Sequence, residues 1–291
     1  MRAHHAIFAF FLTCASALQP RFTSNQRGLL VPATTETQPP LVVLVGMAQT
    51  LSTWQLLHGT ALSKQRHVLF YQALGLGEAF EACDVSLPAQ ADCLLQTLNE
   101  AFPDEKLVDV AGFSLGGRIA LAAAVIQPDR FRRLHLTGVA RQRSDWGHLT
   151  LWQWQDHLQQ DNLRAFAWSA LLASYSPAFL KRQSQERLQE WIAAVTKSQT
   201  SEGLSALLEQ AHPEQGEWSV SGTASQVLKK KGRLVVGEGD QLAPVEYVQA
   251  LAEDLGWGDP MVIPTVGHSV PIESPRLWRE DLLLYLDGED E

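Results

Sequence analysis

Cysteine and charge are both scarce in this 291-residue chain, and a metal-binding pattern is missing. Three cysteines, Cys14, Cys83 and Cys93, are too few for a disulfide framework, and their spacing matches no metal site. Charged residues make up 19%, which excludes a disordered or coiled-coil protein. The net charge of -9 argues against nucleic acid or an anionic membrane as a partner. What is left is a globular protein, long enough for one large domain that carries an insertion.

The N-terminus has no acidic residue before Glu36. Residues 1–17 combine Arg2, a short apolar run and small residues, which is typical of a signal peptide cleaved after Ala17. The apolar run is shorter than the about 20 residues that span a bilayer, so we expect no stable membrane span. Residues 18–36 have the composition of a transit-like segment and linker. Together they resemble the bipartite plastid leader of algae with secondary plastids. The sequence therefore predicts a plastid location, with plain secretion as the alternative.

Short apolar runs alternate with helical patterns along most of the chain. The runs are typical of strands buried on both faces, and they cover Leu41–Val45, His67–Tyr71, Leu107–Ala111, Leu134–Thr137, Leu234–Gly237 and Met261–Pro264. Helices are expected at Leu87–Phe102, Leu115–Gln127, Pro244–Leu255 and Pro275–Leu286. This alternation predicts an α/β fold, in which a mostly parallel, doubly wound sheet carries helices on both faces. We expect its core to comprise residues 37–140 and 221–288.

Residues 141–220 break the alternation, because they have a helical pattern and no clear strand. An insertion between two strands of a parallel sheet would lie over the strand ends as a lid, where α/β proteins bind ligands. The segment holds six of the nine tryptophans, Trp146, Trp152, Trp154, Trp168, Trp191 and Trp218. We expect most of them to pack within the lid, and one or two to line an apolar substrate pocket.

The segment Gly112-Phe113-Ser114-Leu115-Gly116 follows a predicted strand and opens a predicted helix. This is the context in which Gly-x-Ser-x-Gly raises a serine hydroxyl above a sheet, on a sharp and strained turn. The two glycines let the strand and helix pass close together. The sequence therefore predicts Ser114 as a nucleophile, whereas the alternative is a tight turn with a capping serine.

A serine nucleophile needs a base, and the base needs an orienting acid, in the chain order Ser, Asp or Glu, His. Asp240 follows the predicted strand Leu234–Gly237, and Glu238 is a near alternative. His268 follows the last predicted strand and precedes the final helix. No other histidine stands after a late strand and downstream of both partners. The predicted catalytic triad is therefore Ser114, Asp240 and His268.

The negative charge that develops on the substrate oxygen needs two backbone donors. One is the Leu115 N–H, at the start of the helix after the nucleophile. The other comes from the loop after the first buried strand, where Met47 follows Gly46. We therefore predict an oxyanion hole formed by the N–H groups of Met47 and Leu115.

These residues resemble those of the α/β-hydrolase superfamily from Leu41 to Leu286. The motif Ser-Leu-Gly-Gly-Arg over 114–118 is similar to that of the lid-bearing small esterases, lactonases and C–C hydrolases. Two features of that family are absent here. Its His-Gly pair after the first strand is Val45-Gly46, and its Asp-x-x-Gly-x-Gly is Gln72-Ala73-Leu74-Gly75-Leu76-Gly77. The first change removes the usual side-chain anchor of the oxyanion loop.

The resemblance implies hydrolysis of a carboxylic ester or thioester of a small, hydrophobic substrate through an acyl-enzyme, with no metal or organic cofactor. Two alternatives remain open. The same Ser-Leu-Gly-Gly-Arg motif resembles a pyruvate-eliminating enzyme of menaquinone and phylloquinone synthesis, which implies that Arg118, and by a weaker match Tyr175, binds an anionic substrate. The other alternative is a hydrolase-like protein that binds a small ligand without turnover.

Overall fold

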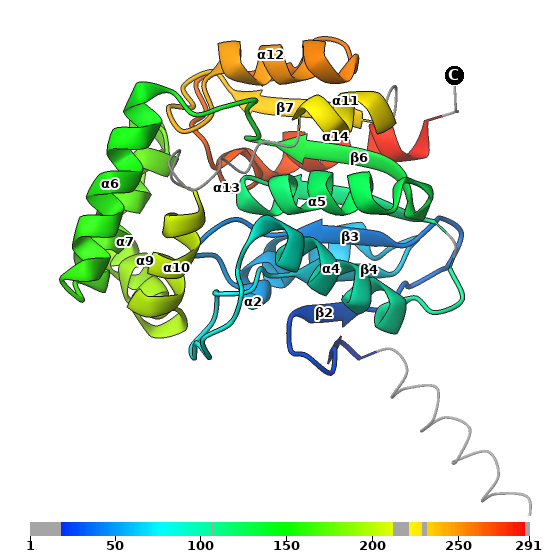
Figure 1. Cartoon of the computed structure of the whole chain (residues 1–291), viewed down its shortest axis with the longest axis horizontal. Helices are drawn as coiled ribbons and strands as arrows, with labels where there is room; N and C mark the ends of the chain where they lie inside the picture. Colours follow the sequence, from blue (N-terminus) through cyan, green and yellow to red (C-terminus); the bar gives the residue numbers. More distant parts are fainter. Residues whose placement is uncertain (1–18, 106, 212–220, 229–231, 289–291) are drawn as a thin grey trace, which may run out of the picture.

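The computed structural model describes residues 19–105, 107–211, 221–228 and 232–288, so the signal peptide predicted over residues 1–17 lies outside it. The described residues form an eight-stranded sheet in the order β1-β2-β4-β3-β5-β6-β7-β8 (Figure 1). From β4 to β8 in this order all neighbouring strands are parallel. The strands are β1 Arg21–Phe22, β2 Gly28–Val31, β3 Leu41–Leu44, β4 Val68–Tyr71, β5 Val108–Phe113, β6 Phe131–Thr137, β7 Gly232–Gly237 and β8 Met261–Ile263. The six apolar runs are therefore confirmed as strands of a mostly parallel sheet.

Helices cover both faces of the sheet, which confirms the doubly wound arrangement (Figure 1). One face is covered by α4 Leu87–Ala101, α5 Leu115–Ile126, α11 Ser221–Val227 and α12 Val245–Leu255. The other is covered by α2 Leu51–Trp54, the π-helix η1 Gln55–Gly59, α3 Thr60–Leu62 and α14 Pro275–Asp287. Two short helices, η2 Pro128–Arg130 and α13 Val270–Glu273, complete the core. Residues 41–44 of the central strand β3 are fully buried, because both faces of the strand pack against helices.

The lid is helical in the part that the structure describes, and it lies across one end of the sheet (Figure 1). Its helices are α6 Asp145–Gln159, α7 Leu163–Ser174, α8 Pro177–Leu180, α9 Gln185–Ser198 and α10 Ser201–Gln210. Each begins after a polar residue whose side-chain oxygen accepts a backbone N–H of the first turn, and these caps are Ser144, Asn162, Ser176, Ser184 and Thr200. Capping satisfies donors that the helix itself leaves unpaired, so the sequence marks the start of every lid helix.

Part of the segment predicted to be transit-like, Arg21–Phe22 and Gly28–Val31, belongs to the sheet. Strand β2 pairs antiparallel with β4, and its residues Leu29, Leu30 and Val31 are buried. The core therefore begins before residue 37, and the predicted boundary is wrong. The pattern of Gly28–Val31 is apolar like the other strands, but its short length and the preceding Arg and Ser/Thr residues concealed it.

Contacts of Arg27 hold the loop over 72–77, where this chain lacks the aspartate of the family's Asp-x-x-Gly-x-Gly pattern. Its guanidinium Nη1 donates to the carbonyls of Ala73 and Leu76, at 3.1 and 2.6 Å. The Gln90 side chain also bonds to the backbone N–H and carbonyl of Leu74. These contacts hold the loop over 72–77 in a protein that has glutamine where the family has aspartate.

We expect a chain that begins at residue 37 to be less stable than one that begins at residue 19. Burial of Leu29, Leu30 and Val31 is worth about 1.5–3 kcal/mol each, so the loss is on the order of 5 kcal/mol or more. The shorter chain should melt on the order of 10 °C lower in a thermal unfolding scan. Equal melting temperatures would contradict the place of β2 in the core.

Candidate active site

The chain reverses sharply between β5 and α5, and Ser114 is the residue at the turn. Its φ of 52° and ψ of -117° are unusual for a residue with a side chain, which is the strain expected of this motif. A Cβ added at Gly112 would lie 2.6 Å from the Gly117 Cα, and one at Gly116 would lie 2.6 Å from the Leu44 carbonyl oxygen. Real Cβ atoms do not approach so closely, so both positions require glycine for the strand and helix to meet.

The structure brings the three predicted triad residues together. The His268 Nε2 lies 2.9 Å from the Ser114 Oγ, and the His268 Nδ1 lies 2.8 Å from the Asp240 Oδ2. Asp240 and His268 are only 4% and 5% exposed. The second carboxylate oxygen of Asp240 accepts the backbone N–H groups of Leu242 and Ala243. With that oxygen held in place, the Asp240 Oδ2 is oriented to accept a hydrogen bond from the Nδ1–H, which leaves the Nε2 facing the serine.

Glu238, the alternative acid, points elsewhere. Its carboxylate accepts the Thr265 N–H at 2.9 Å, and its side chain is exposed. The geometry therefore favours Asp240 as the partner of His268.

Three residues that the sequence analysis did not single out hold His268 in place. The Phe113 ring packs against the imidazole with centroids 5.1 Å apart. Glu273 accepts the N–H groups of Gly267 and Ser176, which ties the histidine loop to the start of α8. Gly138, at the end of β6, adopts a φ of +63° directly beside the imidazole. These contacts join segments far apart in the sequence, so no local pattern identifies them.

We expect Gly138→Ala to lower the activity of this site. The added Cβ would lie 2.9 Å from the His268 Cε1 and 3.0 Å from the Nδ1, so the imidazole must move. A reacting group that is misplaced by about 1 Å can lower the rate about 100-fold. Gly256→Ala is a matched control, because Gly256 has a φ of +68° and nothing within 4 Å of its added Cβ. Equal kcat/KM for the two variants would contradict the role of Gly138.

The loop after β3 is anchored by Gln49 instead of the family's histidine. The Gln49 Oε1 accepts the Gly46 N–H at 3.0 Å and the Trp54 indole N–H at 2.8 Å. Trp54 is buried beneath this loop, so the anchor is itself fixed. Met47 and Leu115, the predicted oxyanion-hole residues, both line the cavity that contains Ser114. The Leu115 N–H belongs to the first turn of α5, where helical N–H groups have no intrahelical partner.

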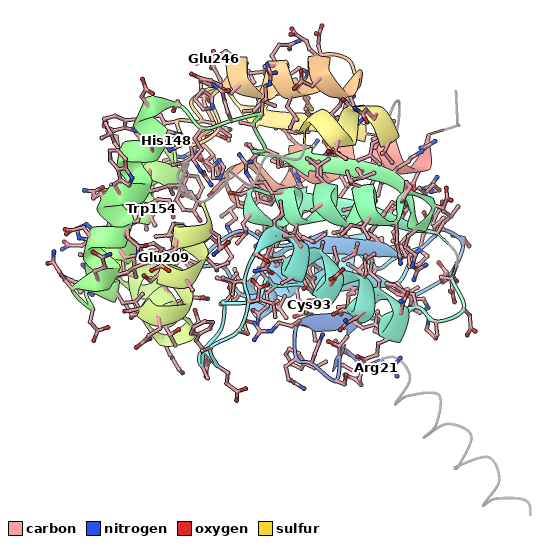
Figure 2. The ribbon with its side chains drawn as sticks, in the orientation of Figure 1. Arg21, Cys93, His148, Trp154, Glu209 and Glu246 are labelled. Carbon is pink, nitrogen blue, oxygen red and sulfur yellow. The ribbon has the colours of Figure 1, made fainter. Side chains whose placement is uncertain are left out.

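A cavity of about 80 Å³ lies over Ser114 and His268. Apolar residues of the lid and core form much of its wall, and they include Leu151, Trp154 and Phe166. Figure 2 labels Trp154 on α6, and the residue is buried there against Phe166. Two guanidinium groups, Arg118 and Arg143, line the same cavity, and among the residues that the structure describes no Asp or Glu does so. Arg118 also donates to the Ala140 carbonyl, and both arginines interact with other groups of the protein.

Tyr175 lies outside the wall of this cavity, in contact with the two cavities that adjoin it. Its ring stacks on Phe179 and Trp191, and its hydroxyl bonds with the Ser269 side chain. Burial raises the pKa of Tyr175 to about 12. At neutral pH its hydroxyl is therefore uncharged, so Tyr175 can offer an anionic substrate only a neutral hydrogen bond.

The six tryptophans of residues 141–220 differ in their surroundings. Trp154 lines the cavity over Ser114, and Trp191 lines two neighbouring cavities. Trp146 and Trp152 are more than half exposed, and Trp146 lines a separate cavity beside Asp240. Trp218 lies outside the described residues. Within the described part of the chain, no group of three or more His, Cys, Asp or Glu side chains is arranged to hold a metal ion. In the same part, no helix has the length and apolarity to cross a membrane.

A serine on a strained turn at the carboxyl end of a mostly parallel sheet, below a helical lid, defines a class of hydrolases. A model of the alpha/beta hydrolase family matches residues 41–280. Since this is most of the chain, the chain belongs to the alpha/beta hydrolase family, and the fold class predicted from the sequence is confirmed.

Individual relatives agree with this assignment. The pyrrolizixenacetamide deacetylase of Xenorhabdus hominickii is 26% identical over 186 residues, which span 62% of this chain and 66% of the relative, just under two thirds. An alpha/beta hydrolase from a Medee basin deep-sea metagenome library has a TM-score of 0.77 at 19% identity, with 94% of this chain and 98% of that chain covered. The enol-lactonase of Burkholderia xenovorans has a TM-score of 0.76 at 17% identity, with 93% and 100% covered. At these identities the structural matches show a shared fold.

Proposed function

We propose that this protein hydrolyses a carboxylic ester or thioester through a covalent acyl-enzyme on Ser114. The observation that supports this most strongly is the continuous hydrogen-bonded chain from Asp240 through His268 to Ser114, which ends at a cavity. An activated nucleophile requires a base within hydrogen-bonding distance and a group that orients the base. In this proposal His268 is the base, and Asp240 orients it.

In the first step the Ser114 Oγ attacks the carbonyl carbon and its proton passes to the His268 Nε2. Asp240 accepts the Nδ1–H and stabilises the imidazolium. The negative oxygen rests on the N–H groups of Met47 and Leu115, each typically worth about 3 kcal/mol. The bond from carbon to the leaving oxygen or sulfur then breaks, and the leaving group takes the proton from Nε2. The acyl group stays on the serine.

In the second step water attacks the acyl carbon while His268 accepts one of the water protons. The tetrahedral intermediate collapses, the carboxylic acid leaves, and Ser114 recovers its proton from Nε2. No metal or organic cofactor takes part in either step. The relative named as a deacetylase suggests acetyl esters and acetamides as members of the first substrate panel.

A second candidate function is elimination from an anionic substrate, with His268 as the base. It is supported by the cavity wall, because the guanidinium groups of Arg118 and Arg143 line the same cavity as the serine. Guanidinium groups suit planar carboxylates. A binding protein without turnover is the third alternative, and it predicts no reaction with any of these substrates.

Labelling by a fluorophosphonate probe tests the main proposal. The probe should react with the intact protein, and peptide mapping should find the label on Ser114. A burst of product equal to the enzyme concentration should appear with p-nitrophenyl acetate, since an acyl-enzyme accumulates. Elimination predicts no burst. A folded protein that takes no label would contradict the ester hydrolase proposal.

We also propose a plastid location from the composition of residues 1–36, a signal-peptide pattern over 1–17 followed by a transit-like segment. Strands β1 and β2 of the sheet lie within that second segment. A fluorescent protein fused after residue 36 should enter the plastid of a secondary-plastid alga. Secretion of the fusion would favour the alternative location.

A further inference from the structure

Three adjoining cavities lead from the nucleophile toward the protein surface. The cavity over Ser114, of about 80 Å³, shares Met47, Ala48 and Ala170 with a second cavity of about 100 Å³. The second shares Tyr175, Trp191 and Val195 with a third, of about 380 Å³. The three cavities adjoin along these shared residues, so we treat them together and call them the acyl passage.

The core and the lid form opposite walls of the acyl passage. On the core side lie the loop after β3 and residues of α2 and η1, including Trp54 and Leu57. On the lid side lie residues of α7, α8 and α9. An aromatic stack there joins Tyr175, which follows α7, to Phe179 on α8 and Trp191 on α9, with centroids 5.4 and 5.7 Å apart. At its outer end the passage reaches Leu56, which is 86% exposed.

Beyond the cavity over Ser114, which Arg118 and Arg143 line, the walls of the passage carry little charge. The second cavity is lined by apolar and neutral polar side chains alone among the described residues. Among the described residues, Arg187 is the one charged residue that lines the third cavity. Its guanidinium lies over the Trp191 ring and pairs with Glu190. In the second cavity a charged group would lose its hydration without gaining a partner of opposite charge among the described residues, whereas an apolar chain would bury its surface.

The sizes of the cavities set the shape of the substrate. Ligand pockets commonly have volumes of about 300–1,000 Å³, so the cavity over Ser114 holds little more than the reacting group. The larger space begins beyond Tyr175 and Trp191. A substrate larger than an acetyl ester therefore has to extend along the passage.

We propose that the substrate is an ester with an extended, uncharged apolar arm that lies in the acyl passage, between η1 and α9. This rests on the proposed function and names its substrate class. Each methylene buried in the passage should raise kcat/KM by about fourfold until the arm reaches the surface.

Ala194→Trp tests the proposal, because Ala194 lines only the outer cavity and its side chain is exposed on α9. Ala193→Trp is the matched control, since Ala193 is the exposed neighbour that lines none of the three cavities. The kcat/KM of each protein is measured with p-nitrophenyl esters from acetate to octanoate, and with octyl acetate.

In the parent and in Ala193→Trp, kcat/KM should rise with chain length. In Ala194→Trp it should fall at least tenfold for an octyl or octanoyl arm and stay unchanged for p-nitrophenyl acetate. If kcat/KM of Ala194→Trp falls with the octanoate alone, the acyl part of the substrate lies in the passage. If it falls with octyl acetate alone, the alcohol part lies there. Equal profiles for the two variants would overturn the proposal.

Binding without turnover separates this proposal from the proposed function. Octanamide is titrated by calorimetry into Ser114→Ala, with and without Ala194→Trp. If octanamide binds the double variant at least tenfold more weakly than it binds Ser114→Ala, the result supports the passage. This holds even if the parent protein takes no fluorophosphonate label. Equal binding in a protein whose parent does take the label would overturn the passage and leave the ester hydrolase in place.

Discussion

Ser114→Ala should lower kcat for ester hydrolysis by about 10⁵- to 10⁶-fold and abolish fluorophosphonate labelling. The loss is large because the variant lacks the only group that is both aimed at the cavity and bonded to the His268 Nε2 in the described structure. The residual rate reflects the oxyanion hole and substrate binding, which do not need the hydroxyl. Stopped-flow kinetics with p-nitrophenyl esters measure the change.

Two results would show whether the loss of kcat comes from the missing hydroxyl or from a damaged fold. The melting temperature of Ser114→Ala should match or exceed that of the parent, because alanine at a φ of 52° keeps the turn and removes no core contact. Ser52→Ala, an exposed serine on α2, should retain full activity. If Ser114→Ala kept more than a tenth of the parent kcat, the covalent mechanism would be wrong.

Asp240→Asn should lower kcat by about 10⁴-fold with little change in stability. The amide has nearly the shape of the carboxylate, but its NH₂ group favours the wrong tautomer of His268, with the proton on Nε2. It also cannot stabilise the imidazolium that forms when Ser114 gives up its proton. The Asp240 Oδ2 lies 2.8 Å from the Nδ1, so the effect acts directly on the base.

Glu238→Gln is the matched control for Asp240→Asn. Glu238 lies two residues earlier on the same loop, but its carboxylate is exposed and bonds to the Thr265 N–H. The control should change kcat less than twofold. A large loss in Glu238→Gln together with a small loss in Asp240→Asn would reverse the assignment of the acid.

The strands and helices of the core could be predicted from the sequence because their signals are local. Leu41–Leu44 is apolar at every position, as a strand covered by helices on both faces must be. Strand β2 was missed, since four residues in an N-terminus rich in Arg, Ser and Thr give a weak pattern. Only its pairing with β4 shows that it belongs to the core.

The three members of the proposed triad were predicted because each follows the carboxyl end of a strand, and parallel strands bring those ends together at one edge. The supporting residues were not predictable in this way. Gln49 takes the place of a family histidine that is expected four residues earlier, at the position of Val45, and Glu273 joins the histidine loop to the lid. Contacts of this kind depend on distances across the fold, which residue spacing does not encode.

The sequence by itself determined the α/β architecture, the strained turn at Ser114 and the chain order of serine, acid and base, because hydrophobic periodicity and glycine positions are properties of neighbouring residues. Only the tertiary structure showed that Asp240 and not Glu238 bonds to His268, placed Gly138 against the imidazole, and formed the cavity between η1 and α9. The physical reason is that a cavity and a hydrogen-bonded chain are formed by side chains from distant segments, and they exist only once the lid packs over the core.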